Sequence, residues 1–165
     1  AGVSIERAFN NPIGDHRMVK DYIRKIGYPE YKKYYSFAFV RNPWDKMVSN
    51  YEYDKKGGHD GKRKKYKADI ISFNEWLKIL PKFHDKPKKS YTNQIDWLVN
   101  KDGKIDVNYI ARFENIEKEW EYLSSVIGFD VFYLFLNNGF YYDDESIKLV
   151  DSYYKKDIEH FGYEF

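Results

Sequence analysis

The pattern of apolar and polar residues along the chain predicts a strand followed directly by a helix. Residues 35–40 (YSFAFV) form a short apolar and aromatic run, which is typical of a strand buried on both faces of a parallel sheet. Asn42, Pro43 and Asp45 come next, and they suit the N-cap, first and third positions of a helix. That helix carries one apolar stripe, made of Trp44, Met47, Val48 and Tyr51.

The same strand and helix pattern occurs a second time. Residues 107–113 (VNYIARF) predict a strand that leads into a helix over residues 116–127, with Gly128 as its stop. The apolar positions of this helix are Ile116, Trp120, Leu123 and Ile127. Three further helices are predicted over residues 17–26, 73–80 and 145–161, the second with a capping box of Ser72 and Glu75. Strands that alternate with helices favour an α/β fold with a central parallel sheet flanked by helices.

Composition narrows the class of protein. The chain has 165 residues, of which 42% are hydrophobic and 20% aromatic, so we expect one folded domain and exclude a disordered chain. It has no cysteine, which excludes disulfides and thiolate chemistry and leads us to expect a cytoplasmic protein, with a lumenal protein held by an N-terminal anchor as the alternative. Its four histidines lack metal-ligand spacing, so we expect no metal. No apolar run is long enough for a membrane helix.

Charge is concentrated in two segments. Residues 54–69 hold seven bases against three acids, and residues 78–89 hold five lysines against one aspartate. Because the net charge is only +2, the remainder is acidic, and we expect no nucleic-acid partner. The basic loop contains Lys62, Arg63, Lys64 and Lys65. Either it attracts an anionic substrate electrostatically, or it is a solvent-exposed loop with no role in binding.

Arg41 is the first candidate binding residue. It follows the strand at 35–40, and ligands of parallel sheets bind beyond the carboxyl ends of strands, near helix N-termini. A guanidinium there is suited to a phosphate, to which Ser49 on the following helix would add a hydroxyl. The alternative is that Arg41 pairs with a carboxylate and that Ser49 is simply solvated.

Three segments resemble one enzyme family. Residues 37–53 (FAFVRNPWDKMVSNYEY) closely resemble the 3′-phosphate-binding segment of sulfotransferases that use PAPS (3′-phosphoadenosine 5′-phosphosulfate), particularly the carbohydrate and uronyl 2-O-sulfotransferase branch. Residues 109–120 (YIARFENIEKEW) and 157–165 (DIEHFGYEF) resemble later segments of the same family. The resemblance implies a P-loop-like three-layer α/β fold. It also implies that Arg41 and Ser49 hold the 3′-phosphate of PAPS.

The N-terminal residues resemble part of the family's phosphosulfate loop. Ala1, Gly2, Val3 and Ser4 match its second half, which implies that they bind the 5′-phosphosulfate, although Val3 stands where threonine is usual. We therefore expect the domain over residues 1–165 to begin inside this loop, without the first strand and the loop lysine. The alternative is that these four residues simply begin a helix.

His16 is the candidate catalytic base. It resembles in position the catalytic histidine of the uronyl 2-O-sulfotransferases, and an imidazole titrates near neutral pH. The alternative is that His16 and Asp15 cap the helix at 17–26.

Together these features predict a sulfotransferase that moves a sulfuryl group from PAPS to a hydroxyl acceptor, which we expect to be a carbohydrate, with an anionic glycan as one option. Two alternatives remain. One is a P-loop kinase or nucleotide hydrolase, disfavoured because a GxxxxGK[ST] motif is not evident. The other is a non-catalytic module that binds anionic glycans through its aromatic and lysine side chains.

Overall fold

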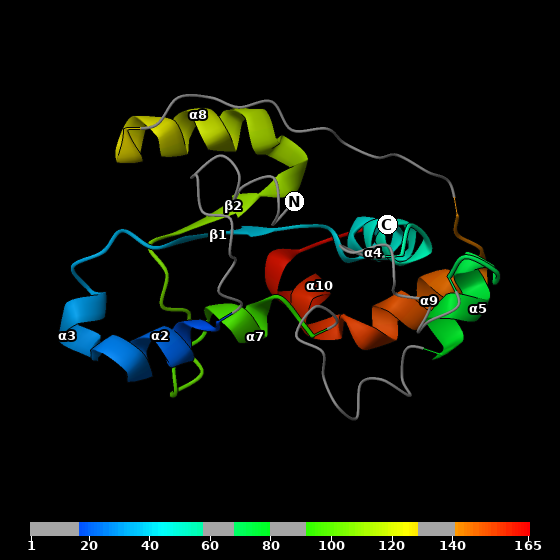
Figure 1. Ribbon diagram of the computed structural model, residues 1–165, viewed down its shortest axis with the longest axis horizontal. Helices are drawn as coiled ribbons and strands as arrows, with labels where there is room; N and C mark the ends of the chain where they lie inside the picture. The colour runs from blue at the N-terminus through cyan, green and yellow to red at the C-terminus, as the bar shows by residue number, and fades with distance from the viewer. Residues whose placement is uncertain (1–16, 58–67, 80–91, 129–140) are drawn as a thin grey trace. The chain divides into compact units, whose positions relative to one another are not determined.

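The computed structural model describes residues 17–57, 68–79, 92–128 and 141–165. Their elements are α2 (Val19–Ile26), α3 (Tyr28–Tyr31), β1 (Phe37–Val40), α4 (Pro43–Lys55), α5 (Phe73–Ile79), α7 (Ile95–Leu98), β2 (Tyr109–Arg112), the short 3-10 helix η4 (Phe113–Asn115), α8 (Ile116–Ile127), α9 (Asp144–Tyr153) and α10 (Lys155–Phe161) (Figure 1). They form two compact units. The first comprises Ala1–Arg41 and Gln94–Leu136, and the second comprises Asn42–Asn93 and Asn137–Phe165.

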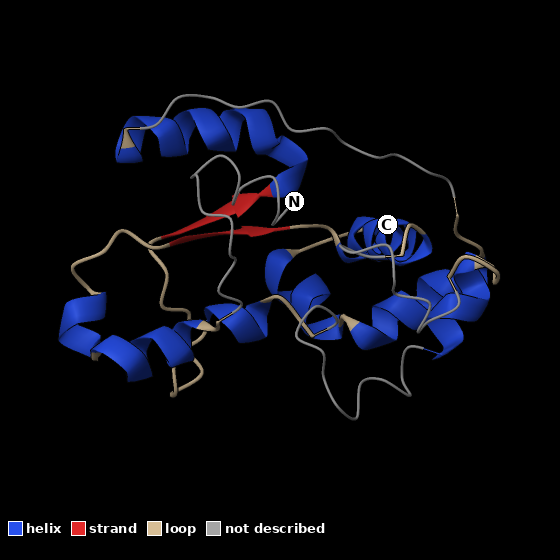
Figure 2. Ribbon diagram, viewed as in Figure 1, coloured by secondary structure: helices blue, strands red, loops and turns tan. Residues whose placement is uncertain are grey.

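Strands β1 and β2 pair in parallel in the first unit (Figure 2). Phe37 lies opposite Tyr109, and Val40 lies opposite Arg112. The expected parallel pairing of strands is present, and the structure shows in addition that the two predicted strands are direct neighbours. We expected residues 35–40 to be buried on both faces, but Phe37, Ala38 and Phe39 are only half-buried. Within the described residues the sheet has two strands, so each of them is an edge strand.

Helix α8 packs against this strand pair. As predicted, Ile116, Trp120 and Leu123 are buried, and the ring of Trp120 stacks on that of Phe39 with the ring centres 6.2 Å apart. Gly128 ends the helix in the left-handed region, with φ at 77°. The Glu119 carboxylate accepts hydrogen bonds from the Tyr109 hydroxyl and, at 3.2 Å, from the Arg112 N–H. One carboxylate therefore ties α8 to both ends of β2.

Helices α2, α3 and α7 lie on the other side of the strands from α8 in the view of Figure 1. The Tyr31 hydroxyl donates to the Asp106 carbonyl, and the Lys32 ammonium pairs with the Asp106 carboxylate at 2.9 Å. These contacts join α3 to the segment that enters β2. Neither α3 nor α7 was predicted, because four residues are too few to establish a helical periodicity.

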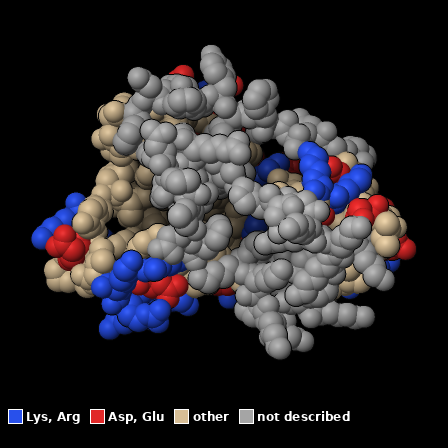
Figure 3. All heavy atoms as spheres, in the orientation of Figure 1, with Lys and Arg blue, Asp and Glu red and all other residues tan. Residues whose placement is uncertain are grey.

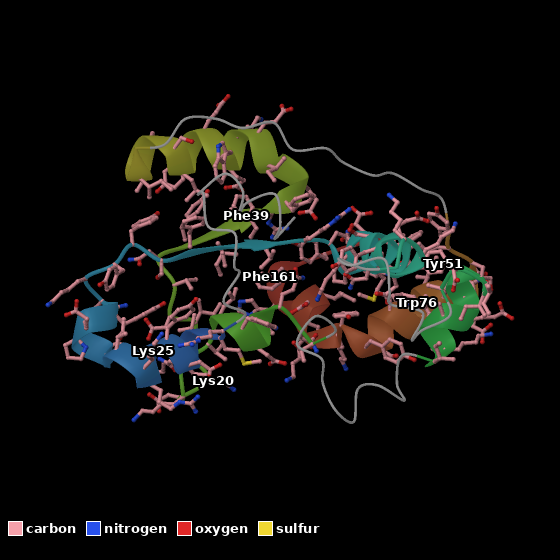
Figure 4. The ribbon with its side chains drawn as sticks, in the orientation of Figure 1. Lys20, Lys25, Phe39, Tyr51, Trp76 and Phe161 are labelled. Atoms are coloured by element: carbon pink, nitrogen blue, oxygen red, sulfur yellow. The ribbon has the colours of Figure 1, made fainter. Side chains whose placement is uncertain are left out.

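Helix α4 is the first element of the second unit, and it starts where the sequence predicts a helix. The Asn42 side chain accepts a hydrogen bond from the Trp44 N–H at 3.0 Å, which makes Asn42 the N-cap. All four residues of the predicted stripe are buried: Trp44, Met47, Val48 and Tyr51. Helix α5 starts with the predicted capping box, since Glu75 accepts from the Ser72 N–H at 2.8 Å. The Tyr51 ring contacts Trp76 of α5, with the ring centres 5.6 Å apart (Figure 4).

The predicted helix over residues 145–161 is two helices. It bends at Tyr154, where φ is −114° and ψ is 24°, between α9 and α10. The main-chain hydrogen bonds continue through the bend, because the Tyr154 N–H donates to the Val150 carbonyl and the Ile158 N–H donates to the Tyr154 carbonyl. Tyr154 is fully buried. Periodicity could not reveal the bend, because apolar spacing continues across it.

Candidate active site

Arg41 lies at the carboxyl end of β1, where the sequence placed it. The parallel register puts Val40 opposite Arg112, so that Arg41 and Phe113 leave the sheet at the same edge. Arg41 and Phe113, which directly follow the two strands, therefore lie at one edge of the sheet in the first unit. This edge of a parallel sheet is where ligands of α/β proteins bind.

The Arg41 side chain lies over an aromatic ring. Its guanidinium carbon is 4.8 Å from the centre of the Phe113 ring. Phe113 is itself buried, with 5% of its surface exposed. At this distance the cation is attracted to the ring face, and the flat guanidinium is supported from one side. Sequence analysis did not identify Phe113 as a site residue, although Phe113 lies in the segment at 109–120 that carries the family resemblance.

The main chain of Arg41 has a second partner. The Arg41 N–H donates to Gln94 Oε1 at 2.9 Å, and Gln94 Nε2 donates to the Arg41 carbonyl at 2.8 Å. Gln94 comes immediately before α7. The sequence carried no signal for this contact, because a single glutamine before a four-residue helix has no distinctive pattern.

Ser49 lies in α4, on the half-buried side of the helix. Its neighbours Met47 and Val48 point into the core of the second unit. Arg41 closes the first unit and Ser49 belongs to the second. Their joint role as a phosphate site therefore stays a prediction.

The other predicted site residues lie outside the described residues. They are Ala1, Gly2, Val3 and Ser4 of the phosphosulfate loop, the candidate base His16, and Lys62, Arg63, Lys64 and Lys65 of the basic loop. Their roles stay predictions. Near His16, the described chain shows that α2 begins at Val19 with Met18 as N-cap, and that Asp21 accepts a hydrogen bond from the Met18 N–H at 3.2 Å.

Lys46 is a titratable residue that sequence analysis did not single out. It lies in the first turns of α4, and its ammonium donates to the Thr92 carbonyl at 3.1 Å. The same ammonium is 4.7 Å from the centre of the Tyr154 ring. Burial lowers the pKa of Lys46 to about 8, and the nearby charge of Asp157 limits that decrease. An amine of this kind exchanges its proton in mildly alkaline solution.

Basic side chains gather over α2 on the face shown in Figure 3. Figure 4 labels two of them, Lys20 and Lys25. Residues 17–26 hold four bases and one acid, and that acid, Asp21, pairs with Arg24 at 2.9 Å. This patch is separate in sequence from the two basic segments that the charge pattern identified.

An open groove in the second unit runs along α9 and α10 and includes the C-terminal Phe165. Its lining mixes apolar residues, such as Ile147 and Ile158, with lysines and acids of both helices. No predicted site residue lines it, so the groove adds nothing to the case for a phosphate site.

The described ranges contain neither a membrane-spanning helix nor a metal-holding group of side chains. No helix there is both long and apolar enough to cross a membrane. In the same part of the chain, no group of three or more histidine or acidic side chains is arranged to hold a metal ion.

Comparison with known proteins places these features in one family. A sequence model described as the sulfotransferase family matches residues 4–164. Comparisons with curated proteins and with solved structures gave no match. The matched range includes both strands and the residues that follow them at the sheet edge, Arg41 and Phe113.

Proposed function

Because the chain belongs to the sulfotransferase family, we propose that it moves a sulfuryl group from PAPS to a hydroxyl group of a carbohydrate. The proposal extends to a P-loop-like three-layer fold and to the carbohydrate and uronyl 2-O-sulfotransferase branch. The observation that carries it is the position of Arg41, which leaves the carboxyl edge of the sheet with its guanidinium 4.8 Å from the Phe113 ring.

The residues at this edge fit a phosphate group. A guanidinium offers a flat set of N–H donors that match phosphate oxygens, and the Phe113 ring supports that group at the sheet edge. In the proposal, Arg41 and the Ser49 hydroxyl hold the 3′-phosphate of the donor. Residues Ala1, Gly2, Val3 and Ser4 hold the 5′-phosphosulfate through main-chain N–H groups.

Sulfuryl transfer then requires alignment and the removal of one proton. His16 accepts the proton of the acceptor hydroxyl while the acceptor oxygen forms a bond to sulfur. The bond between sulfur and the 5′-phosphate oxygen breaks, which leaves adenosine 3′,5′-bisphosphate. Main-chain N–H groups of the loop stabilise the charge that develops on that leaving oxygen. Lys62, Arg63, Lys64 and Lys65 attract an anionic acceptor.

Titration calorimetry on the protein at its full natural length tests this proposal. We expect adenosine 3′,5′-bisphosphate to bind more tightly than adenosine 5′-phosphate, because only the former carries the 3′-phosphate that Arg41 recognises. Tight binding of ATP with Mg²⁺ and none of the bisphosphate would instead indicate a kinase or nucleotide hydrolase. Binding of glycans alone would indicate a non-catalytic module. Incubation with PAPS and a panel of sugars, followed by mass spectrometry, then identifies the sulfated product.

A further inference from the structure

The side-chain amide of Gln94 pairs with both main-chain polar groups of Arg41. The Arg41 N–H donates to Oε1 at 2.9 Å, and Nε2 donates to the Arg41 carbonyl at 2.8 Å. A main-chain N–H is always a donor and a carbonyl is always an acceptor, so the two contacts also determine which way round the amide lies. The Gln94 amide thus makes the same two hydrogen bonds to Arg41 that the main chain of a neighbouring strand would make.

The contact lies just beyond the last hydrogen-bonded residue pair of the sheet. The ladder between β1 and β2 ends with Val40 opposite Arg112, so Arg41 is the first residue beyond it. Main-chain groups of a partly buried residue need partners, and beyond the ladder a strand no longer supplies them. Gln94 supplies them from the start of α7. The contact therefore fixes the peptide groups on both sides of the Arg41 Cα, and with them the direction in which its side chain leaves the backbone.

The far end of Arg41 is also held, since its guanidinium lies over the Phe113 ring. An arginine restrained at the main chain and at the guanidinium loses less conformational freedom when an anion binds. Both restraints belong to the first unit.

We propose that Gln94 is a positioning residue of the anion site and that it acts through Arg41. The inference rests on the proposed function, because the anion concerned is the 3′-phosphate of the nucleotide. Gln94 need not touch the nucleotide. It holds the main chain of Arg41 in the conformation from which the guanidinium meets that phosphate.

The chain offers a matched control at the opposite end of β1. There the side-chain amide of Asn108 accepts a hydrogen bond from the Ser36 N–H at 2.9 Å. Asn108→Ala therefore removes an amide contact to the residue that precedes the same strand, while leaving Arg41 untouched. Gln94→Met removes both contacts to Arg41 and keeps a side chain of similar length.

The experiment measures the affinities of adenosine 3′,5′-bisphosphate and adenosine 5′-phosphate for the parent, both variants, Arg41→Ala and the double variant. We expect Gln94→Met to weaken the bisphosphate about tenfold and to leave the monophosphate within about twofold of the parent. Asn108→Ala should leave both affinities within about twofold. In the Arg41→Ala background, Gln94→Met should cause no further loss, because residues that act through one another are not additive.

Three outcomes overturn the inference. In the first, Gln94→Met binds the bisphosphate as tightly as the parent, and in the second it loses affinity equally for both nucleotides. The third is an additive loss of affinity in the Arg41→Ala background. If Gln94→Met does not fold, Gln94→Glu replaces it, since it keeps an acceptor for the Arg41 N–H but sets a carboxylate against the Arg41 carbonyl. Its bisphosphate preference should fall similarly, and an unchanged preference overturns the inference. A parent with no preference for the bisphosphate refutes the proposed function itself, and the inference falls with it.

Discussion

The guanidinium of Arg41 lies 4.8 Å from the centre of the Phe113 ring, although the two residues are far apart in the sequence. Parallel pairing of β1 with β2 brings them together, since each residue directly follows the last paired residue of its strand. The aromatic face attracts the cation and orients it. Arg41 is thus held in a defined direction at the sheet edge.

Replacement of Phe113 should therefore weaken nucleotide binding. We expect Phe113→Leu to reduce the affinity for adenosine 3′,5′-bisphosphate by about 1 kcal/mol, the usual size of a cation–π contact. Calorimetry measures this loss. Phe39→Leu is the control, because the Phe39 ring stacks on Trp120 in the same unit. Equal losses in the two variants would mean that general destabilisation, and not support of Arg41, is responsible.

Replacement of Arg41 itself tests the 3′-phosphate site. Arg41→Ala should weaken bisphosphate binding by about 2 to 4 kcal/mol, because charge-assisted hydrogen bonds to the phosphate are lost. Ser49→Ala should cost about 1 kcal/mol. Arg41→Lys should recover only part of the affinity, since an ammonium lacks the planar fork of a guanidinium. Parental affinity of Arg41→Ala would show that the phosphate binds elsewhere.

The basic loop is expected to act on the acceptor. Replacement of Lys62, Arg63, Lys64 and Lys65 by glutamine should weaken binding of sulfated or uronate-bearing glycans and flatten its salt dependence. Bisphosphate binding should stay nearly unchanged. Isothermal titrations at two salt concentrations measure both effects. If every anionic glycan binds the variant and the parent equally at low salt, the loop has no role in acceptor binding.

The role of His16 is tested by turnover as a function of pH, with the protein at its full natural length. His16→Ala should reduce turnover about a hundredfold or more, the usual cost of losing a general base, with little change in bisphosphate affinity. The parental rate should rise with pH through the imidazole pKa, because only the neutral ring accepts a proton. A histidine that merely caps α2 would instead affect thermal stability and leave the rate profile intact.

Lys46 should make stability depend on pH. Burial lowers its pKa to about 8 in the folded protein, from 10.5. Between these values the unfolded chain binds more protons, so the free energy of unfolding should rise with pH, by about 1 to 3 kcal/mol across that window. Tyr109 acts in the opposite sense, mainly near and above pH 10, because its hydrogen bond to Glu119 raises its pKa to about 12.

Urea denaturation at pH 7.5 and pH 9.0 measures the effect of Lys46 where tyrosines, with an ordinary pKa of about 10, are still largely protonated. Lys46→Met should remove most of the increase in stability between the two pH values. Lys148→Met, a substitution at an exposed position of α9, should keep it. An increase of the same size in Lys46→Met and in the parent would assign the effect to another group.

Local features of the fold could be predicted from the sequence. The Asn42 cap, the box of Ser72 and Glu75, and the stripe of α4 all depend on residues within one or two turns of each other, so the sequence displays them directly. The sequence also placed Arg41 at the end of a strand. The family resemblance supplied its proposed ligand, which composition and spacing had left open.

Contacts between distant segments were decided only by tertiary structure. The pairing of Gln94 with Arg41, the ring of Phe113 below the guanidinium, and the enclosure of Lys46 by Thr92 and Tyr154 join segments that no local pattern relates. The strand register and the packing of helices select such partners, and both depend on burial summed over many residues. The sequence by itself therefore determined which residue carries the charge at the sheet edge, whereas the tertiary structure decided what holds that residue in place.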